Sequence, residues 1–196
     1  MLDKEQNLPT FEEYLILEEK AAYKSEYYQG QIVAMAGASL THNRIVSNLH
    51  AALYNALQTK PCAVFASDLR LWIEQANRAV YPDIMVICGE PQLVAGRTDT
   101  VTNPQIIIEV LSKSTAEEDR SDKFQAYWSL DTFAEYVLVD QHRLRVEYFR
   151  RVNEKLWELL VFTQPDDVLT LKSIGVGLPL AQIYRQVQWE GDEKAN

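Results

Sequence analysis

Apolar residues recur at helical spacing in three segments of the chain. The clearest stripe lies within residues 40–58 and contains Ile45, Val46, Leu49, Ala52, Leu53, Ala56 and Leu57. Ser39 or Thr41 can cap that helix. Residues 11–19 favour a short helix with an acidic face. Thr115 and Glu118 have the spacing of a capping box, which predicts a helix to about Leu130 with Phe124, Tyr127 and Trp128 facing inward.

Elsewhere the pattern changes to that of strands. Residues 84–88 and 106–111 are short and nearly all apolar, which is typical of strands buried on both faces. Residues 63–74 alternate in part, and residues 135–139 are again strand-like. Residues 26–35 are predicted to form a hairpin or a bent strand with a turn at Gln29-Gly30, and residues 143–162 to form a hairpin with a turn at Asn153-Glu154. The order of elements predicts an α/β fold, a mixed β-sheet flanked by helices with a C-terminal antiparallel hairpin.

Composition is that of one globular domain. The chain has 196 residues, 47% of them apolar and 24% charged, which excludes disordered, collagen-like and coiled-coil classes. We expect a single domain over residues 1–196, with a core of about 10–185 and a polar tail over 189–196. The formal net charge of −9 argues against a protein that coats nucleic acid non-specifically, because phosphate contacts need clustered cations.

Cysteine usage and hydropathy indicate the compartment. Cys62 and Cys88 have no metal-ligand spacing, and each lies in an apolar run, so we expect two buried free thiols. The first residues lack the apolar core of a secretory signal, and no apolar run approaches the roughly 20 residues needed to cross a bilayer. A reducing cytoplasm, with no membrane partner, is the expected location.

Two acids occupy positions where acids usually cost free energy. Asp83 follows Pro82 and opens the apolar segment 84–88, and Glu109 is embedded among the aliphatic residues of 106–111. A buried carboxylate stays ionised when a cation neutralises it, and a divalent metal does this well. The alternative for Glu109 is a position at an edge of the sheet facing solvent, or a pairing with an arginine.

A lysine on the helix that follows Glu109 is the third candidate. Asp119, Lys123 and Tyr127 lie on one helical face, so Lys123 can point back over the end of the acid-bearing strand. The alternative is a surface ammonium paired with Asp119. The histidines His42, His50 and His142 share no metal spacing, and His50 is expected at the boundary of the core.

The ordered set of these motifs resembles a large bacterial family of restriction-endonuclease-like proteins in the PD-(D/E)XK nuclease superfamily. The residues that carry the resemblance are Pro82-Asp83, Glu109-Val110-Leu111-Ser112, Ser114-Thr115, Asp119, Lys123, Tyr127, Glu135-Tyr136 and Val139-Asp140. Glu26-Tyr27, Gly30 and His42 also match, and the resemblance covers roughly residues 10–185. It implies a restriction-endonuclease-like sheet flanked by helices.

The resemblance also implies site residues. Asp83 and Glu109 take the two acidic positions, and Glu26 adds a further carboxylate. The motif lysine is replaced by Leu111, so Lys123 is the expected substitute, with Lys113 in the next loop as its rival. We therefore expect Asp83, Glu109, Lys123 and Glu26 to be catalytic.

Hard oxygen ligands suit Mg²⁺ or Mn²⁺, so the side chains of Asp83 and Glu109 and the carbonyl of Val110 are the expected metal ligands. The predicted function is metal-dependent hydrolysis of DNA phosphodiester bonds by a homodimer. The alternative is an inactive dimeric scaffold or binding protein with the same fold, which the missing motif lysine and the net charge favour. The basic segment 143–155 is a candidate for phosphate contacts, and an ordinary solvated face is the alternative.

Overall fold

The computed structural model describes residues 8–113 and 115–189, and its centre is a six-stranded sheet. The strand order is β11-β10-β9-β8-β6-β3, and only β8 and β9 pair in parallel. The strands are β3 (Cys62–Ala66), β6 (Ile84–Cys88), β8 (Ile106–Leu111), β9 (Glu135–Asp140), β10 (Val146–Asn153) and β11 (Leu156–Phe162). Both buried apolar segments of the sequence become inner strands, since β6 and β8 have strands on either side.

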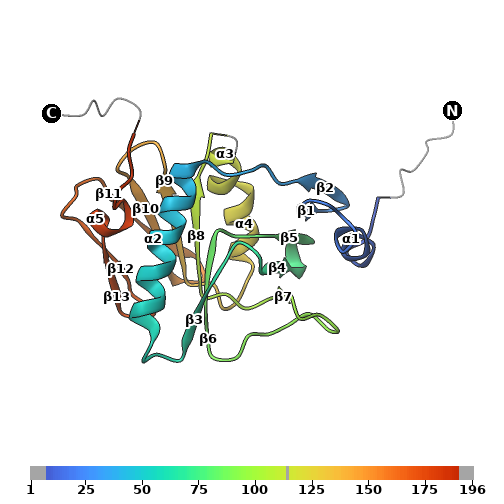
Figure 1. Ribbon diagram of the computed structural model, residues 1–196. Helices are drawn as coiled ribbons and strands as arrows, with labels where there is room; N and C mark the ends of the chain where they lie inside the picture. Colours follow the sequence, from blue (N-terminus) through green and yellow to red (C-terminus); the bar gives the residue numbers. More distant parts are fainter. Residues whose placement is uncertain (1–7, 114, 190–196) are drawn as a thin grey trace.

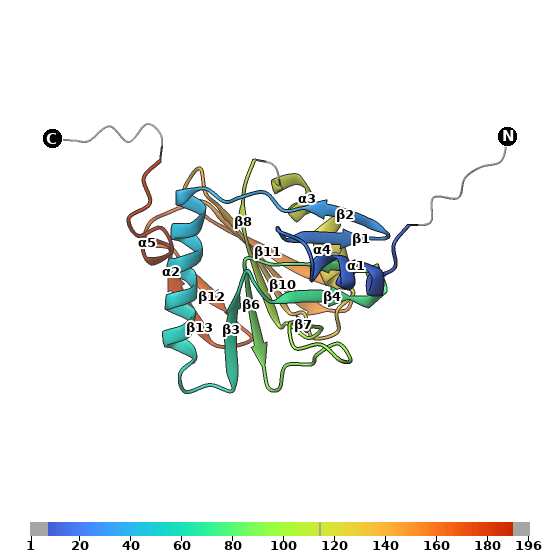
Figure 2. The same cartoon turned by 45° about the vertical axis from the view of Figure 1, so that its right-hand side comes forward.

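Helices cover this sheet on both faces (Figures 1 and 2). The long helix α2 (Leu40–Leu57) packs its stripe of Ile45, Leu49 and Leu53 on one face. Its N-cap is Ser39, whose side chain accepts a hydrogen bond from His42 N. On the other face lie α3 (Ala116–Arg120) and α4 (Asp122–Trp128), whose Tyr127 is fully buried.

A second, five-stranded sheet has the order β2-β1-β5-β4-β7. Its strands are β1 (Ser25–Tyr28), β2 (Gln31–Ala34), β4 (Arg70–Ile73), β5 (Arg78–Val80) and β7 (Thr100–Val101), with a 3₁₀ turn, η1 (Glu74–Ala76), between β4 and β5. The helix α1 (Phe11–Glu18) stacks Phe11 on Trp72, with ring centroids 3.6 Å apart. Residues 81–83 connect β5 of this sheet to β6 of the larger one, so the two sheets meet at Asp83.

The C-terminal part contains a hairpin that the pattern indicated and one that it did not. The pairing of β10 with β11 is the predicted antiparallel hairpin over 143–162. A further hairpin, β12 (Val168–Leu171) with β13 (Val176–Pro179), packs with α5 (Leu180–Ile183) against the α2 face of the sheet. The polar tail expected over 189–196 lies, from residue 190 onward, outside the described residues, and so does Ser114.

The predicted helix over 115–130 is wrong in one respect. It divides into α3 and α4 at Ser121, whose φ of −119° and ψ of −92° leave the helical region. Thr115 is the N-cap of α3, but its side chain caps no backbone N–H, so the expected capping box does not form. Trp128 is 38% exposed rather than facing inward, whereas Tyr127 faces inward as expected.

The prediction of two free thiols is wrong. Cys62 and Cys88 lie opposite each other in the antiparallel pairing of β3 with β6, and they form a disulfide. The argument for a reducing compartment therefore no longer follows from the cysteines, and the cytoplasmic location stays a prediction. None of the helices in the described ranges is long and apolar enough to cross a membrane.

Candidate active site at the junction of the two sheets

Asp83 and Glu109 lie side by side because of the pairing between β6 and β8. Ile84 pairs with Ile108, which places Asp83 level with Glu109. Asp83 N donates a hydrogen bond to Glu109 Oε2 at 3.1 Å, and Val110 N donates one to Asp83 Oδ2 at 2.8 Å. Each carboxylate is thus held by backbone that belongs to the other acid's strand. The structure brings together the two acids that the sequence singled out.

Glu109 is buried beneath α4. Its side chain accepts a hydrogen bond from Tyr127 OH at 2.8 Å, and Lys123 Nζ lies 3.6 Å from the same oxygen. Burial raises the pKa of Glu109 to about 8, and the charge of Lys123 only partly opposes that rise. Without a further cation, Glu109 therefore holds a proton over much of the neutral range.

Lys123 is a buried ammonium surrounded by carboxylates. Its Nζ lies 3.2 Å from Glu26 Oε1 and 3.3 Å from Asp119 Oδ1, in addition to its contact with Glu109. Burial alone would lower the pKa of Lys123, but the surrounding carboxylates outweigh it and raise that pKa above its ordinary value. The group is consequently a fixed positive charge at any physiological pH. The pairing with Asp119 is the one expected from the helical spacing.

The rival lysine lies elsewhere. Lys113 is exposed, and no contact of its side chain is found among the described residues. Leu111 is buried on the same side of β8 as Glu109, next to Tyr127 and the rest of the α4-side core. The position of the missing motif lysine is therefore apolar, and the ammonium beside Glu109 comes from α4.

Glu26 reaches the same cluster from the second sheet. It lies on β1, opposite Val33 of β2. Its Oε1 accepts a hydrogen bond from Tyr81 N at 3.4 Å, and its Oε2 lies 4.0 Å from Arg78. Arg78 is buried and also pairs with Glu118 at the start of α3. This arginine was not expected from the sequence, because its partners come from two other elements.

His42 is a further member of the cluster. From the first turn of α2, its Nε2 lies 3.0 Å from Asp83 Oδ1. Burial lowers the pKa of His42, but the hydrogen bond and charge of Asp83, aided by the Val110 carbonyl, give a net rise. The resemblance had included His42 without a role. His50 is half-buried and stacks on Tyr54, as expected for a histidine at the boundary of the core.

The donor chemistry of the cluster fits a hard divalent cation. Each of the four carboxylate oxygens of Asp83 and Glu109 accepts one hydrogen bond, which leaves further lone pairs for a ligand. Asp119 Oδ1 is buried, and it meets Lys123 Nζ at 3.3 Å without a well-aligned hydrogen bond. Two carboxylates, one carbonyl and several waters are an ordinary ligand set for Mg²⁺. Among the described residues, however, no group of three or more His, Cys, Asp or Glu side chains is arranged to hold a metal ion.

The balance of charges in the cluster also favours a bound cation. Glu26, Asp83, Glu109 and Asp119 face two permanent cations, Lys123 and Arg78. Burial also raises the pKa of Asp119, although Lys123 opposes the rise. In the protein without a metal, bound protons and His42 compensate for the excess negative charge of the carboxylates. A bound divalent cation would neutralise the same charge without those protons.

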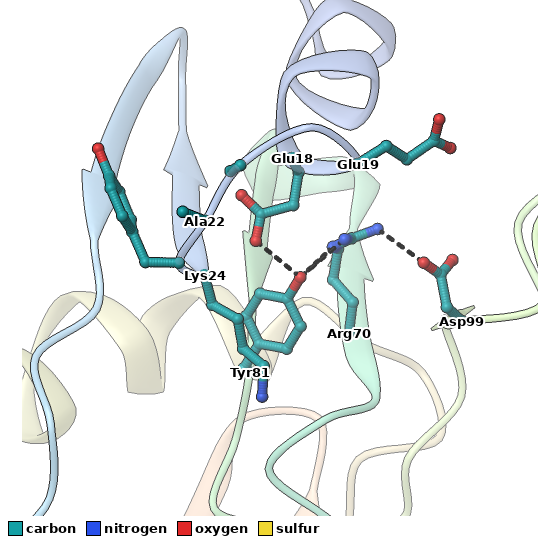
Figure 3. Close-up of a pocket in the computed structure, with 9 residues that line it drawn as sticks. Glu18, Glu19, Ala22, Lys24, Arg70, Tyr81 and Asp99 are labelled. Carbon is teal, nitrogen blue, oxygen red and sulfur yellow. Dashed lines mark hydrogen bonds and ion pairs between the residues drawn. The ribbon is translucent and has the colours of Figure 1, made fainter.

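A neighbouring polar network holds Tyr81, two residues before Asp83. Tyr81 lines a cavity of about 270 Å³. Its hydroxyl lies between Glu18 and Arg70 (Figure 3). The hydroxyl donates to Glu18 Oε1 at 3.0 Å and accepts two hydrogen bonds from the buried Arg70 guanidinium, at 2.7 and 2.9 Å. None of the four predicted catalytic residues lines this cavity. Its network supports the segment that presents Asp83, and is not itself the predicted site.

The basic segment 143–155 is mostly paired within the chain. The arginines at 143, 145 and 150 form ion pairs of 2.8–2.9 Å with Asp140, Glu147 and Glu158. Arg151 donates to the Trp128 carbonyl at 2.5 Å. These pairings favour the alternative of an ordinary ion-paired outer face over a strip that contacts phosphates.

The chain is similar in sequence to a known family and to curated proteins. Residues 11–181 match the model of the Uma2 family, described as "Putative restriction endonuclease". The chain is 43% identical over 150 residues to the uncharacterized protein sll1609 of Synechocystis, covering 76% of this chain and 85% of that one. It is 34% identical over 174 residues to the uncharacterized protein slr1290 of the same organism, covering 89% and 90%.

A crystal structure described as a putative nuclease belonging to DUF820 from Anabaena variabilis has a similar fold. The TM-score is 0.72 at 19% identity, and the match covers 90% of this chain and 97% of the other. The expected restriction-endonuclease-like fold, with its mixed sheet and flanking helices, is thereby confirmed, and β10 with β11 forms the expected antiparallel hairpin. From its sequence and its fold, the chain belongs to the Uma2 family of restriction-endonuclease-like proteins.

Proposed function

We propose that the protein is a metal-dependent endonuclease that hydrolyses DNA phosphodiester bonds, with Asp83, Glu109, Lys123 and Glu26 as its catalytic residues. The observation that carries the proposal is the buried cluster in which two adjacent carboxylates and a fixed ammonium meet at the junction of the two sheets. Family membership supports the nuclease class, and such families generally use divalent metals.

The metal ligands in this proposal are the side chains of Asp83 and Glu109 and the Val110 carbonyl, with Mg²⁺ or Mn²⁺ as the ion. A bound cation of this kind supplies an activated water and neutralises charge that develops on the phosphate. Glu109 must give up its proton to act as a ligand, and Tyr127 OH then remains as a donor to its carboxylate.

Lys123 places its charge beside Glu109, where it can orient the attacking water or stabilise the negative charge of the transition state. Glu26 on β1 and Asp119 on α3 both pair with that ammonium. His42 holds Asp83 from the first turn of α2. In this scheme Glu26 acts by fixing Lys123 as well as by its own negative charge.

We further infer that the protein acts as a homodimer in the cytoplasm. A two-fold assembly is the commonest arrangement of soluble oligomers and offers two active sites to a duplex. The alternative function is that of an inactive dimer that binds partners, and Leu111 at the motif position favours it. Metal binding without cleavage would support that alternative.

The decisive experiment incubates supercoiled plasmid with the protein and Mn²⁺ or Mg²⁺. We expect nicked and then linear products from the parent protein, and no products from Asp83→Asn, which keeps the size of the side chain. Lys123→Met should retain Mn²⁺ binding by calorimetry and lose about a hundredfold in cleavage rate, whereas Lys113→Met should cleave like the parent. Absence of cleavage with either metal would contradict the proposal.

A further inference from the structure

The outer strand of the six-stranded sheet has an apolar, unpaired edge. β11 pairs with β10 on one side, and no strand in the described part of the chain pairs with its other side. Four of its apolar side chains are well exposed, namely Leu156 at 52%, Leu159 at 50%, and Leu160 and Val161 at 42% each. Folded proteins usually protect such an edge with charges, bulges or a covering element, because it offers free backbone groups to another strand.

We propose that β11 pairs in an antiparallel manner with β11 of a second copy of this chain, about a two-fold axis at Leu159. The two six-stranded sheets then form one continuous sheet. This inference rests on the homodimer included in the proposed function, and it names the surface that forms it.

The sequence of β11 is self-complementary in this arrangement. Antiparallel pairing centred on Leu159 places Leu156 opposite Phe162, Trp157 opposite Val161, and Leu159 opposite its own copy. The same register places Glu158, the one charged residue of the strand, opposite Leu160, and Arg150 of the same chain already pairs with Glu158 at 2.9 Å. No like charges therefore meet across the strand pair, and every other pair of opposed residues is apolar.

The two ends of the strand differ in charge. Glu154 and Lys155 precede β11, so that end is neutral overall, whereas Asp166 and Asp167 follow the strand and make the other end acidic. The side chains of Lys155 and Asp166 are exposed. A parallel pair would bring the two acidic ends together. An antiparallel pair instead brings Lys155 of one copy toward the acidic end of the other, which favours a second copy in this orientation.

The surface next to β11 extends the apolar contact. Trp128 on α4 is 38% exposed, and its ring packs on Trp157 with centroids 5.6 Å apart. Val152, near the end of β10, is 46% exposed. Both residues lie next to the strand pair rather than near the cluster of Asp83 and Glu109, so the interface leaves each active site complete within one copy.

The register across the sheet fixes where the two sites lie in this dimer. Across the sheet, Glu109 pairs with Leu138, Leu138 with Glu147, and Glu147 with Val161. Glu109 is therefore level with Val161, which lies two positions from the axis at Leu159. Seven strand spacings separate the two copies of Glu109, which is about 34 Å along the sheet at roughly 4.8 Å per spacing. Each site would act on its own phosphodiester bond.

The test is the oligomeric state of the full chain, measured by light scattering and sedimentation equilibrium at roughly 1–100 µM. We expect a dimer of about twice 22.5 kDa. Leu159→Lys should weaken dimerisation at least tenfold, because it sets two ammonium groups opposite each other at the axis. The matched control is Val33→Lys on β2, the exposed edge of the other sheet, which should leave the dimer intact.

Two further measurements make the outcome unambiguous. Lys155→Glu should weaken the dimer, and adding Asp166→Lys should restore it. Leu159→Cys should give a covalent dimer on mild oxidation, whereas Val33→Cys should not. A monomeric parent protein at 100 µM, or a dimer lost in Val33→Lys and kept in Leu159→Lys, would overturn the proposal. Leu159→Lys should bind Mn²⁺ like the parent. If the parent protein fails to cleave plasmid, that result counts against the proposed function and not against this interface.

Discussion

Replacing Lys123 by methionine tests the electrostatics of the buried cluster directly. Methionine keeps most of the apolar stem and removes the charge, so packing around α4 changes little. At pH 8.5 we expect the free energy of unfolding to fall by about 3–5 kcal/mol, the usual cost of removing one partner from a buried ion pair. The reason is that Glu26, Asp119 and Glu109 all lie within 3.6 Å of the ammonium and would lose it together.

The loss should depend on pH with a definite sign. Burial already raises the pKa values of Glu109 and Asp119, and Lys123 opposes both rises. In the variant both pKa values should rise further. An acid whose folded pKa is raised contributes stability that is complete below its unfolded pKa and is lost as pH rises through the folded pKa. The parent already loses stability through Glu109 between about pH 4.5 and pH 8, and the variant should go on losing it above pH 8. The difference between variant and parent should therefore be larger at pH 8.5 than at pH 5.

The measurement is urea unfolding of both proteins at pH 5 and pH 8.5, followed by tryptophan fluorescence. Lys113→Met is the control, since an exposed lysine without side-chain contacts should change the free energy of unfolding by less than about 0.5 kcal/mol. An equal loss for Lys123→Met at both pH values would show that the lysine acts through packing. No loss at pH 8.5 would show that the carboxylates do not need its charge.

Three other outcomes follow from the same contacts. Mn²⁺ binding should release close to one proton at pH 6.5 and almost none at pH 9, because burial raises the pKa of Glu109 to about 8. Calorimetry in two buffers of different ionisation enthalpy measures the number of protons released. An absence of proton release at pH 6.5 would contradict this prediction. Tyr127→Phe removes a hydrogen-bond donor to Glu109 and should lower the free energy of unfolding by about 1–3 kcal/mol, which urea unfolding would measure. The same substitution should weaken Mn²⁺ binding at pH 7, which a metal titration would measure. Reduction of the Cys62–Cys88 disulfide should lower the free energy of unfolding by roughly 3 kcal/mol, given its sequence separation of 26, whereas the double alanine variant should be insensitive to reductant.

Much of the fold could be predicted where local pattern decides the structure. The aliphatic runs gave β6 and β8 with their observed bounds, and the apolar stripe gave α2 to within one residue, because both depend on burial along a single element. The hairpin of β12 with β13 was not foreseen. The break at Ser121 was missed as well, because the preference for helix is similar on either side of it.

Features that depend on long-range register could not be predicted. Cys62 and Cys88 become partners because β3 pairs with β6 in one particular register, and no local signal specifies that register. The arginines of 143–155 find carboxylates on neighbouring strands for the same reason. Within the site, Asp83, Glu109 and Lys123 were accessible from the resemblance and from spacing, but the contact of Lys123 with Glu26 joins two different sheets.

The hydrogen bonds that cross between Asp83 and Glu109 couple these two residues as a thermodynamic unit. Removing the Asp83 carboxylate leaves Val110 N–H without its acceptor, and removing the Glu109 carboxylate does the same to Asp83 N–H. Each single substitution therefore also disturbs the backbone that holds the other acid. The effects of the two substitutions on stability or metal affinity should not add, and a double-mutant cycle should yield a coupling free energy between them on the order of 1 kcal/mol or more. Under the proposed function, metal affinity would belong to the pair and could not be divided between its members.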